Sequence, residues 1–254
     1  VKEHLKDKVV ILGGPHAEFY LDGCIEHPFD YIVVGDGELA LKKILFEHPL
    51  EDRVISVPVT EEEMNQFPLP YRESSFLNQY NFYVQGEKAT TILTAKGCPM
   101  SCAFCEHSGT KVRLYEPDHV DKQILQAKSA GYNCIMFFDD IFALSIKRVK
   151  SLAGVMKHNV IYRCFAHART ISDEMISILA DSGCIEVGFG AESGSQIILD
   201  TIGKKTTVEQ NMELVNICNR HGIKVKAFIV LGLPGESFET IENTKLFLDF
   251  LSKK

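Results

Sequence analysis

Three cysteines stand within eight residues of one another, at the spacing C-x3-C-x2-C: Cys98, Cys102 and Cys105. Thiolates are preferred ligands of iron–sulfur clusters and also bind zinc. A structural zinc site needs four protein ligands, usually as two pairs, and no fourth Cys or His stands at pair spacing, although His107 is close. Three thiolates on a cubane leave one iron free for a substrate or cofactor. The spacing therefore favours a catalytic [4Fe–4S] cluster, with zinc as the alternative.

The composition is that of a folded globular protein. Of 254 residues, 45% are hydrophobic and 24% are charged, which suits one large domain or two smaller ones. We find neither an apolar run long enough to span a membrane nor an N-terminal signal peptide, so the sequence predicts a cytoplasmic protein without a membrane span. The formal charge of −7 disfavours a nucleic-acid partner.

The first sixty residues have the pattern of parallel strands linked by helices. Apolar runs at residues 9–12 and 31–34 each end in a glycine turn, a helical pattern follows at 39–47, and a third strand is expected at 54–57. We expect residues 1–60 to form part of a doubly wound, Rossmann-like α/β segment. It is too short for a complete domain of that kind.

A connector is expected at residues 61–87. It begins with three glutamates at 61–63 and continues through Pro68 and Pro70, which exclude a helix there. The pattern places the domain boundary in this connector.

The region 88–254 alternates strands with helices, which is typical of a parallel α/β barrel. Ser145, Ser172 and Thr207 precede helical patterns as N-caps, and a last helix is expected at 238–251. In such barrels the chemistry lies at the carboxyl ends of the strands. The expected strands lie near residues 90–94, 134–138, 161–165, 185–190 and 224–231.

The cysteine motif, with Phe104 as the aromatic residue in C-x3-C-x-aromatic-C, resembles the signature of the radical S-adenosylmethionine (SAM) superfamily. Residues 188–195 and 229–236 resemble the fourth-strand and fifth-strand segments of that family. The resemblance implies a partial barrel in which Cys98, Cys102 and Cys105 hold a [4Fe–4S] cluster whose open iron is chelated by SAM. One electron into the cluster then yields methionine and a 5′-deoxyadenosyl radical. It also implies a small-molecule substrate and an electron donor such as flavodoxin or ferredoxin.

The same resemblance suggests residues that bind SAM. Many members accept the methionyl amine on a Gly-Gly-Glu stretch after the second strand, where this chain has Asp139 and Asp140, and either carboxylate is a candidate. Glu192 and Ser193 are expected at the ribose hydroxyls or the methionyl group. The glycines around Leu231 are expected to let the backbone approach the adenine. The expected cofactor-binding set is Phe104, Asp139, Asp140, Glu192, Ser193, Gly232 and Leu233; a catalytic residue for the later steps is not assigned.

The front segment resembles the C-terminal half of the cobalamin-binding domain that precedes many such barrels. It has no Asp-x-His-x-x-Gly motif, so a histidine ligand for cobalt is not assigned. The family barrel usually has a sixth strand, and this chain stops after the fifth helix, so we expect a fragment. Three functions follow: a cobalamin-dependent radical SAM enzyme for methyl transfer or ring formation, a cobalamin-independent one such as a methylthiotransferase-like protein, or a non-catalytic iron–sulfur or zinc protein.

Several other residues have simpler interpretations. The cysteines outside the motif that fall in or beside apolar segments are expected in the core, where cysteine behaves as a small hydrophobic residue; they are Cys134, Cys164, Cys184 and Cys218. The basic pairs 147–148 and 204–205 are expected on solvated faces. His167 and Arg169, just after the third strand, are expected either at the barrel mouth or as a surface pair.

Overall fold

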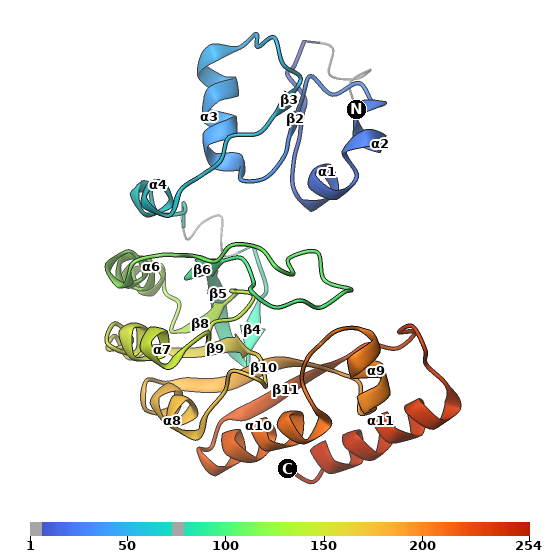
Figure 1. Ribbon diagram of the computed structural model, residues 1–254. Helices are drawn as coiled ribbons and strands as arrows, with labels where there is room; N and C mark the ends of the chain where they lie inside the picture. The colour runs from blue at the N-terminus through green and yellow to red at the C-terminus, as the bar shows by residue number, and fades with distance from the viewer. Residues whose placement is uncertain (1–6, 73–78) are drawn as a thin grey trace. The chain divides into compact units, whose positions relative to one another are not determined.

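The computed structural model describes residues 7–72 and 79–254. The chain divides into two compact units, Val1–Gln66 and Phe67–Lys254 (Figure 1). Each unit has its own sheet, and the two units are described separately below.

The first unit has a parallel sheet in the order β1-β2-β3, formed by Ile11–Leu12, Tyr31–Val33 and Val54–Ile55. All three residues of β2 are buried, because helices cover both faces of the sheet (Figure 1). Ile32 packs with Ala17 and Cys24 on one face, and the other face packs against α3. The helices are α1 (Pro15–Phe19), α2 (Leu21–Ile25), α3 (Gly37–Glu47) and α4 (Glu61–Gln66).

The predicted connector, 61–87, contains elements that the sequence pattern did not suggest. Helix α4 occupies Glu61–Gln66, ahead of the prolines. Thr60 and Glu63 stabilise its start, because the N–H of Thr60 donates to Glu63 Oε2 (2.9 Å) and the N–H of Glu63 donates to Thr60 Oγ1 (3.2 Å). Strand β4 (Tyr83–Val84) and the first residue of β5 lie at the other end. Residues 73–78 of the predicted connector lie outside the described residues.

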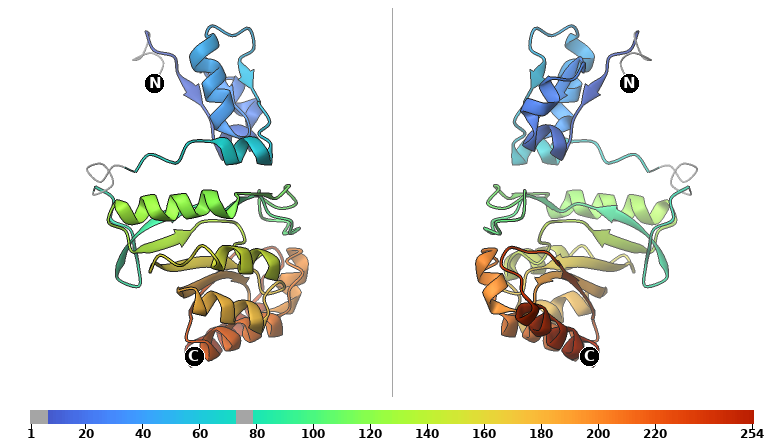
Figure 2. Two further views of the ribbon diagram at one scale, coloured as in Figure 1. Left: turned by 90° about the vertical axis from the view of Figure 1, so that its left-hand side faces the viewer. Right: turned by 90° about the vertical axis from the view of Figure 1, so that its right-hand side faces the viewer.

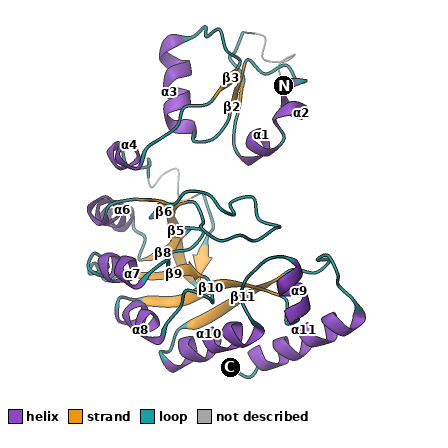
Figure 3. Cartoon of the chain, in the orientation of Figure 1, coloured by secondary structure: helices purple, strands orange, loops and turns teal. Residues whose placement is uncertain are grey.

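The second unit is a curled sheet in the order β11-β10-β9-β8-β5-β4, in which only the β4–β5 pair is antiparallel (Figure 3). The predicted partial barrel is confirmed, and each expected strand overlaps an observed one. The parallel strands are β5 (Glu87–Ile92), β8 (Cys134–Phe137), β9 (Ile161–Ala166), β10 (Cys184–Glu192) and β11 (Lys224–Ile229).

A helix follows each parallel strand, and these helices lie along the outside of the sheet, except for the short α9, which lies at the carboxyl end of β10 (Figures 1 and 2). They are α6 (Pro117–Ser129), α7 (Ile146–Ala153), α8 (Asp173–Asp181), α9 (Gln196–Thr201), α10 (Val208–Arg220) and α11 (Phe238–Leu251). Between sheet and helices, Phe137 stacks on Phe142 with ring centroids 4.8 Å apart and meets Tyr162 edge-on at 5.3 Å. The four cysteines expected in the core are buried, and Cys134 packs with Val84, Ala89 and Met136.

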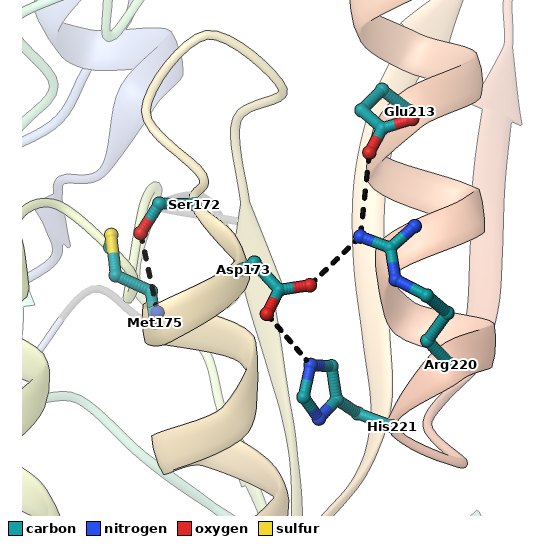
Figure 4. A network of polar contacts seen from close by, with 6 residues as sticks. All are labelled: Ser172, Asp173, Met175, Glu213, Arg220 and His221. Carbon is teal, nitrogen blue, oxygen red and sulfur yellow. Dashed lines mark hydrogen bonds and ion pairs between the residues drawn. The ribbon is translucent and has the colours of Figure 1, made fainter.

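Hydroxyl side chains begin α7, α8 and α10, as predicted. Ser145 accepts the N–H of Arg148 at the start of α7, and Thr207 forms a capping box with Gln210 at the start of α10. Ser172 accepts the N–H of Met175 at the start of α8 (Figure 4).

The first residue of α8 also links this helix to α10 (Figure 4). Asp173 Oδ1 lies 2.8 Å from Arg220 Nη2 and Asp173 Oδ2 lies 3.3 Å from His221 Nε2. Arg220 also reaches Glu213 at 3.5 Å. Most of these side chains are more than half exposed, so the network aligns the two helices more than it stabilises the fold.

The two ends of the curled sheet are joined at the amino ends of the parallel strands. Gln85, in the turn between β4 and β5, accepts a hydrogen bond from Lys224 Nζ of β11 (2.7 Å) and donates one to Glu186 of β10. Glu186 also pairs with Arg163 of β9 at 3.1 Å. The amino end of the half-barrel is therefore filled with paired polar side chains.

Candidate active site

The cysteine loop joins β6 (Ala95–Lys96) to β7 (Arg113–Leu114), which pair with each other as antiparallel strands. Internal hydrogen bonds fold this loop back on itself. The N–H of Cys98 donates to Thr110 Oγ1 (2.9 Å), and the N–H of Gly109 donates to the carbonyl of Met100 (2.6 Å). The loop follows β5, so it lies at the carboxyl end of the first barrel strand, where the sequence predicted the chemistry.

The three thiols differ in exposure but lie within electrostatic range of one another. Cys98 and Cys102 are buried and Cys105 is exposed. Burial raises the pKa of both buried thiols, and the neighbouring Cys105 thiolate raises each pKa further. Within residues 7–72 and 79–254, no three His, Cys, Asp or Glu side chains are arranged around a single metal ion. A cubane binds each thiolate at a different iron, so three thiolates on one folded loop fit such a cluster.

The two neighbouring aspartates after β8 have different environments. Asp139 is 1% exposed, and its Oδ1 accepts the N–H groups of Thr94 (2.6 Å) and Ala95 (3.1 Å). Burial raises the pKa of Asp139 to about 6. Asp140 is partly exposed, and its Oδ1 lies 2.8 Å from Nδ1 of His107 in the cysteine loop. Asp139 therefore holds the start of the loop, while Asp140 lies at its surface.

Glu192 ends β10 in a strained backbone conformation, with φ at 60°. The β10–β11 register shifts between Gly190 and Glu192, and such bulges re-aim side chains. Glu192 Oε1 pairs with Lys204 Nζ at 2.7 Å, and both side chains are 8% exposed. A Cβ at Gly190 would overlap Glu192 Oε1 and lie 2.7 Å from Lys204 Nζ, so only glycine leaves room for this pair. Lys204 Nζ also lies 5.9 Å from the ring of Phe104, which brings Phe104 and Glu192 to the same place.

Three other predicted SAM-binding residues make their contacts elsewhere in the barrel. The hydroxyl of Ser193 is 3.0 Å from the hydroxyl of Thr244 in α11, and Ser193 is 1% exposed. The N–H of Gly232 donates to Glu236 Oε2 (2.5 Å). Leu233 packs with the apolar face of α9. The contacts of these three residues are with Thr244, Glu236 and α9. Their role in SAM binding stays a prediction.

His167 is buried just after β9, whereas Arg169 is exposed. The pKa of His167 is lowered to about 4, mainly by burial and also by the nearby cations Lys204 and Arg169. Its Nε2 has no hydrogen-bond partner among the described residues. The sequence predicted His167 either at the barrel mouth or in a surface pair with Arg169. The surface position is wrong, because His167 is buried.

The prediction that the basic pairs are solvated is wrong for one member of each pair. Lys204 is buried against Glu192, and Arg148 is buried with its Nη2 donating to the carbonyls of Thr94 (2.8 Å) and Tyr115 (2.9 Å). The burial of Lys204 could have been predicted from Glu192, because a carboxylate inside a barrel needs a cationic partner. His107, which pairs with Asp140, was considered only as a zinc ligand.

Comparison with known proteins agrees with this geometry. The sequence profile of the Radical SAM superfamily matches residues 92–248, more than half of the chain. The chain belongs to the radical SAM superfamily. Members of this superfamily combine a [4Fe–4S] cluster with SAM.

Relatives with curated descriptions match nearly the whole chain. An uncharacterized methyltransferase of Pyrococcus horikoshii is 26% identical over 94% of this chain and 57% of its own length. An anaerobic magnesium-protoporphyrin IX monomethyl ester cyclase of Rubrivivax gelatinosus is 23% identical over 96% of this chain and 49% of its own length. The chain thus spans about half the length of these relatives.

Among solved structures, the cobalamin-dependent SAM radical enzyme OxsB, with aqua-cobalamin bound, has a TM-score of 0.78 and 18% identity. The match covers 97% of this chain and 40% of OxsB, and it shows a shared fold.

In the part of the chain that the structure describes, no helix is both long and apolar enough to cross a membrane.

Proposed function

We propose that this chain holds a [4Fe–4S] cluster through Cys98, Cys102 and Cys105 and cleaves SAM reductively to start a radical reaction. The observation that carries the proposal is the folded cysteine loop at the carboxyl end of β5, with the Lys204–Glu192 pair beside it. When bound, the cluster supplies one electron and an open iron for SAM. The protein contributes the positions of the surrounding side chains.

The exposure of the two aspartates suggests a division of roles. Asp140 is the partly exposed carboxylate and is proposed to accept the methionyl amine of SAM, with His107 orienting it. Asp139 accepts two backbone N–H groups on Oδ1 and the Thr94 hydroxyl on Oδ2, so it is proposed to fix the loop. Glu192 is proposed at the ribose hydroxyls or the methionyl group. Phe104, Ser193, Gly232 and Leu233 complete the proposed SAM-binding set.

The relatives suggest the reaction that follows. A methyltransferase and a ring-forming cyclase are among them, and OxsB is described as cobalamin-dependent. We therefore propose cobalamin-dependent methyl transfer or ring formation on a small-molecule substrate. The proposed organisation is a cobalamin-type segment at residues 1–60, a linker at 61–87 and the barrel at 88–254. A flavodoxin or ferredoxin in the cytoplasm is the proposed electron donor.

A second candidate is a cobalamin-independent radical SAM enzyme, such as a methylthiotransferase-like protein. One observation favours it, because the given sequence has no Asp-x-His-x-x-Gly motif to supply a lower ligand to cobalt.

Anaerobic reconstitution tests the proposed cluster and its reaction. We expect about four irons and four sulfides per chain, an electron paramagnetic resonance (EPR) signal of the reduced protein that changes when SAM is added, and 5′-deoxyadenosine formed under reducing conditions. Stoichiometric zinc, or an iron signal that ignores SAM, would contradict the proposal. Methyl transfer from SAM in the presence of excess cobalamin, without a desalting step, separates the two candidate enzymes, because it does not require this chain to retain cobalamin.

A further inference from the structure

The turn that follows α9 contacts the cysteine loop between its first and last cysteines. The N–H of Ala103 donates to the carbonyl of Ile202 (2.9 Å). Gly203 lies in the left-handed region, with φ at 65°, and a Cβ there would stand 3.2 Å from the carbonyl oxygen of Ser101. A non-glycine residue would be strained at this φ and would press on the loop. The segment 202–204 therefore acts as a clasp on the stretch between Cys98 and Cys105.

Lys204 completes the clasp and brings a charge to it. Its ammonium pairs with Glu192 at 2.7 Å and lies 5.9 Å from the ring of Phe104, the residue just before Cys105. Phe104 lies between Cys102 and Cys105 in the loop, so both charges of the Lys204–Glu192 pair lie near these two proposed ligands. With 8% of each side chain exposed, water screens these charges weakly.

We infer that Lys204 is a positioning residue that fixes the cysteine loop against the end of β10 and makes the bound cluster easier to reduce. The inference rests on the proposed cluster. Reduction adds a negative charge, and a nearby buried cation stabilises the reduced form relative to the oxidised one. Removing the cation also leaves the Glu192 carboxylate uncompensated, which acts in the same direction.

The test measures the reduction potential of the cluster by an EPR-monitored titration without SAM. We expect Lys204→Met to shift the potential to more negative values and Lys204→Arg to restore it. Lys205→Met is the matched control, since Lys205 is exposed. Where Lys204→Met fails to fold around an unpaired Glu192, the double variant Lys204→Met with Glu192→Gln removes both charges and should fold with a potential near that of the parent. A Lys204→Met potential equal to that of the Lys205→Met control would overturn the inference, and so would a Lys204→Arg potential as negative as that of Lys204→Met.

A second measurement needs no cluster. In the cluster-free chain, Gly203→Ala should weaken the clasp and speed amide hydrogen exchange at Ala103, while exchange in β8 stays unchanged. Unchanged exchange at Ala103 would contradict the clasp. If the parent chain takes up no iron, the proposed function fails. If all variants hold a full cluster at one potential, the role of Lys204 fails and the proposed function stands.

Discussion

The carboxylate of Asp139 accepts the backbone N–H of Thr94 at 2.6 Å and thereby joins the end of β8 to the start of the cysteine loop. The carbonyl of the same Thr94 accepts a hydrogen bond from Arg148 of α7 at 2.8 Å. Both partners are buried, so the anchor of the loop belongs to the protein core. Residues of the protein core therefore hold the start of the loop, and these contacts need no bound cofactor.

The first prediction follows from this anchor. Asp139→Ala leaves the buried N–H groups of Thr94 and Ala95 without an acceptor and should lower the free energy of unfolding by about 1–3 kcal/mol. Urea unfolding followed by circular dichroism measures this loss. Asp140→Ala is the matched control, since Asp140 is partly exposed, and equal losses in the two variants would contradict the assignment.

The second prediction concerns pH. Burial raises the pKa of Asp139 from 3.8 to about 6, so between these values the folded state binds a proton that the unfolded state has released. Stability should therefore fall as the pH rises from about 4 to about 6, by on the order of 3 kcal/mol from this group. Asp139→Asn carries no titrating group, and the difference between parent and variant across this range isolates the effect. A difference that does not change with pH would refute it.

The third prediction assigns the cluster ligands. Single substitutions Cys98→Ala, Cys102→Ala and Cys105→Ala should each abolish cluster assembly, because each thiolate holds a different iron. Iron and sulfide analysis after anaerobic reconstitution measures the loss. Cys134→Ala and Cys218→Ala are the controls, since both residues are buried away from the loop, and iron loss in either equal to that of Cys102→Ala would show the assignment to be wrong.

The fourth prediction separates the two aspartates. Asp140→Asn should keep the cluster and weaken SAM binding by about 1–3 kcal/mol, which is roughly five-fold to two-hundred-fold in Kd. Asp139→Asn should bind SAM as the parent does, because both Asp139 oxygens already accept hydrogen bonds from Thr94 and Ala95. Calorimetric titration with SAM on the reconstituted variants decides between them. If Asp140→Asn binds SAM with the affinity of the parent, Asp140 is not part of the SAM site.

The fifth prediction concerns cobalamin. The given chain should not retain cobalamin stoichiometrically, because it supplies no Asp-x-His-x-x-Gly ligand and its front sheet has three strands within the described residues. Visible absorption after incubation with cobalamin and desalting gives the answer. One corrin per chain after desalting would show that other residues of the front unit are sufficient.

Local patterns predicted most of the fold. Helix α11 runs over Phe238–Leu251, as its apolar spacing indicated, and Ser172 begins α8 as its N-cap. Two-residue strands such as β6 have no periodicity to detect, and α4 is shorter than two helical turns. Strand β6 depends on its partner strand rather than on its own sequence, whereas the Thr60–Glu63 capping box was a local signal for α4.

The site was less accessible to sequence reasoning, because it depends on which residues meet. The cysteine spacing lies within one loop and is readable along the chain. The Lys204–Glu192 pair joins residues from separate elements, and a lysine in a turn resembles any solvated lysine until its partner is placed. Asp139 and Asp140 are adjacent in sequence, yet the strand end directs one into the core and the other to the loop surface.

Gln85 affects how molecules reach the interior of the half-barrel. It joins β11 and β10 to the turn beside β5, directly below the Arg163–Glu186 ion pair. The polar side chains at the amino end therefore already have partners, and a ligand that approached from there would have to displace one of these contacts. For the proposed enzyme, this favours an approach of the substrate from the carboxyl end of the strands, where the cysteine loop lies.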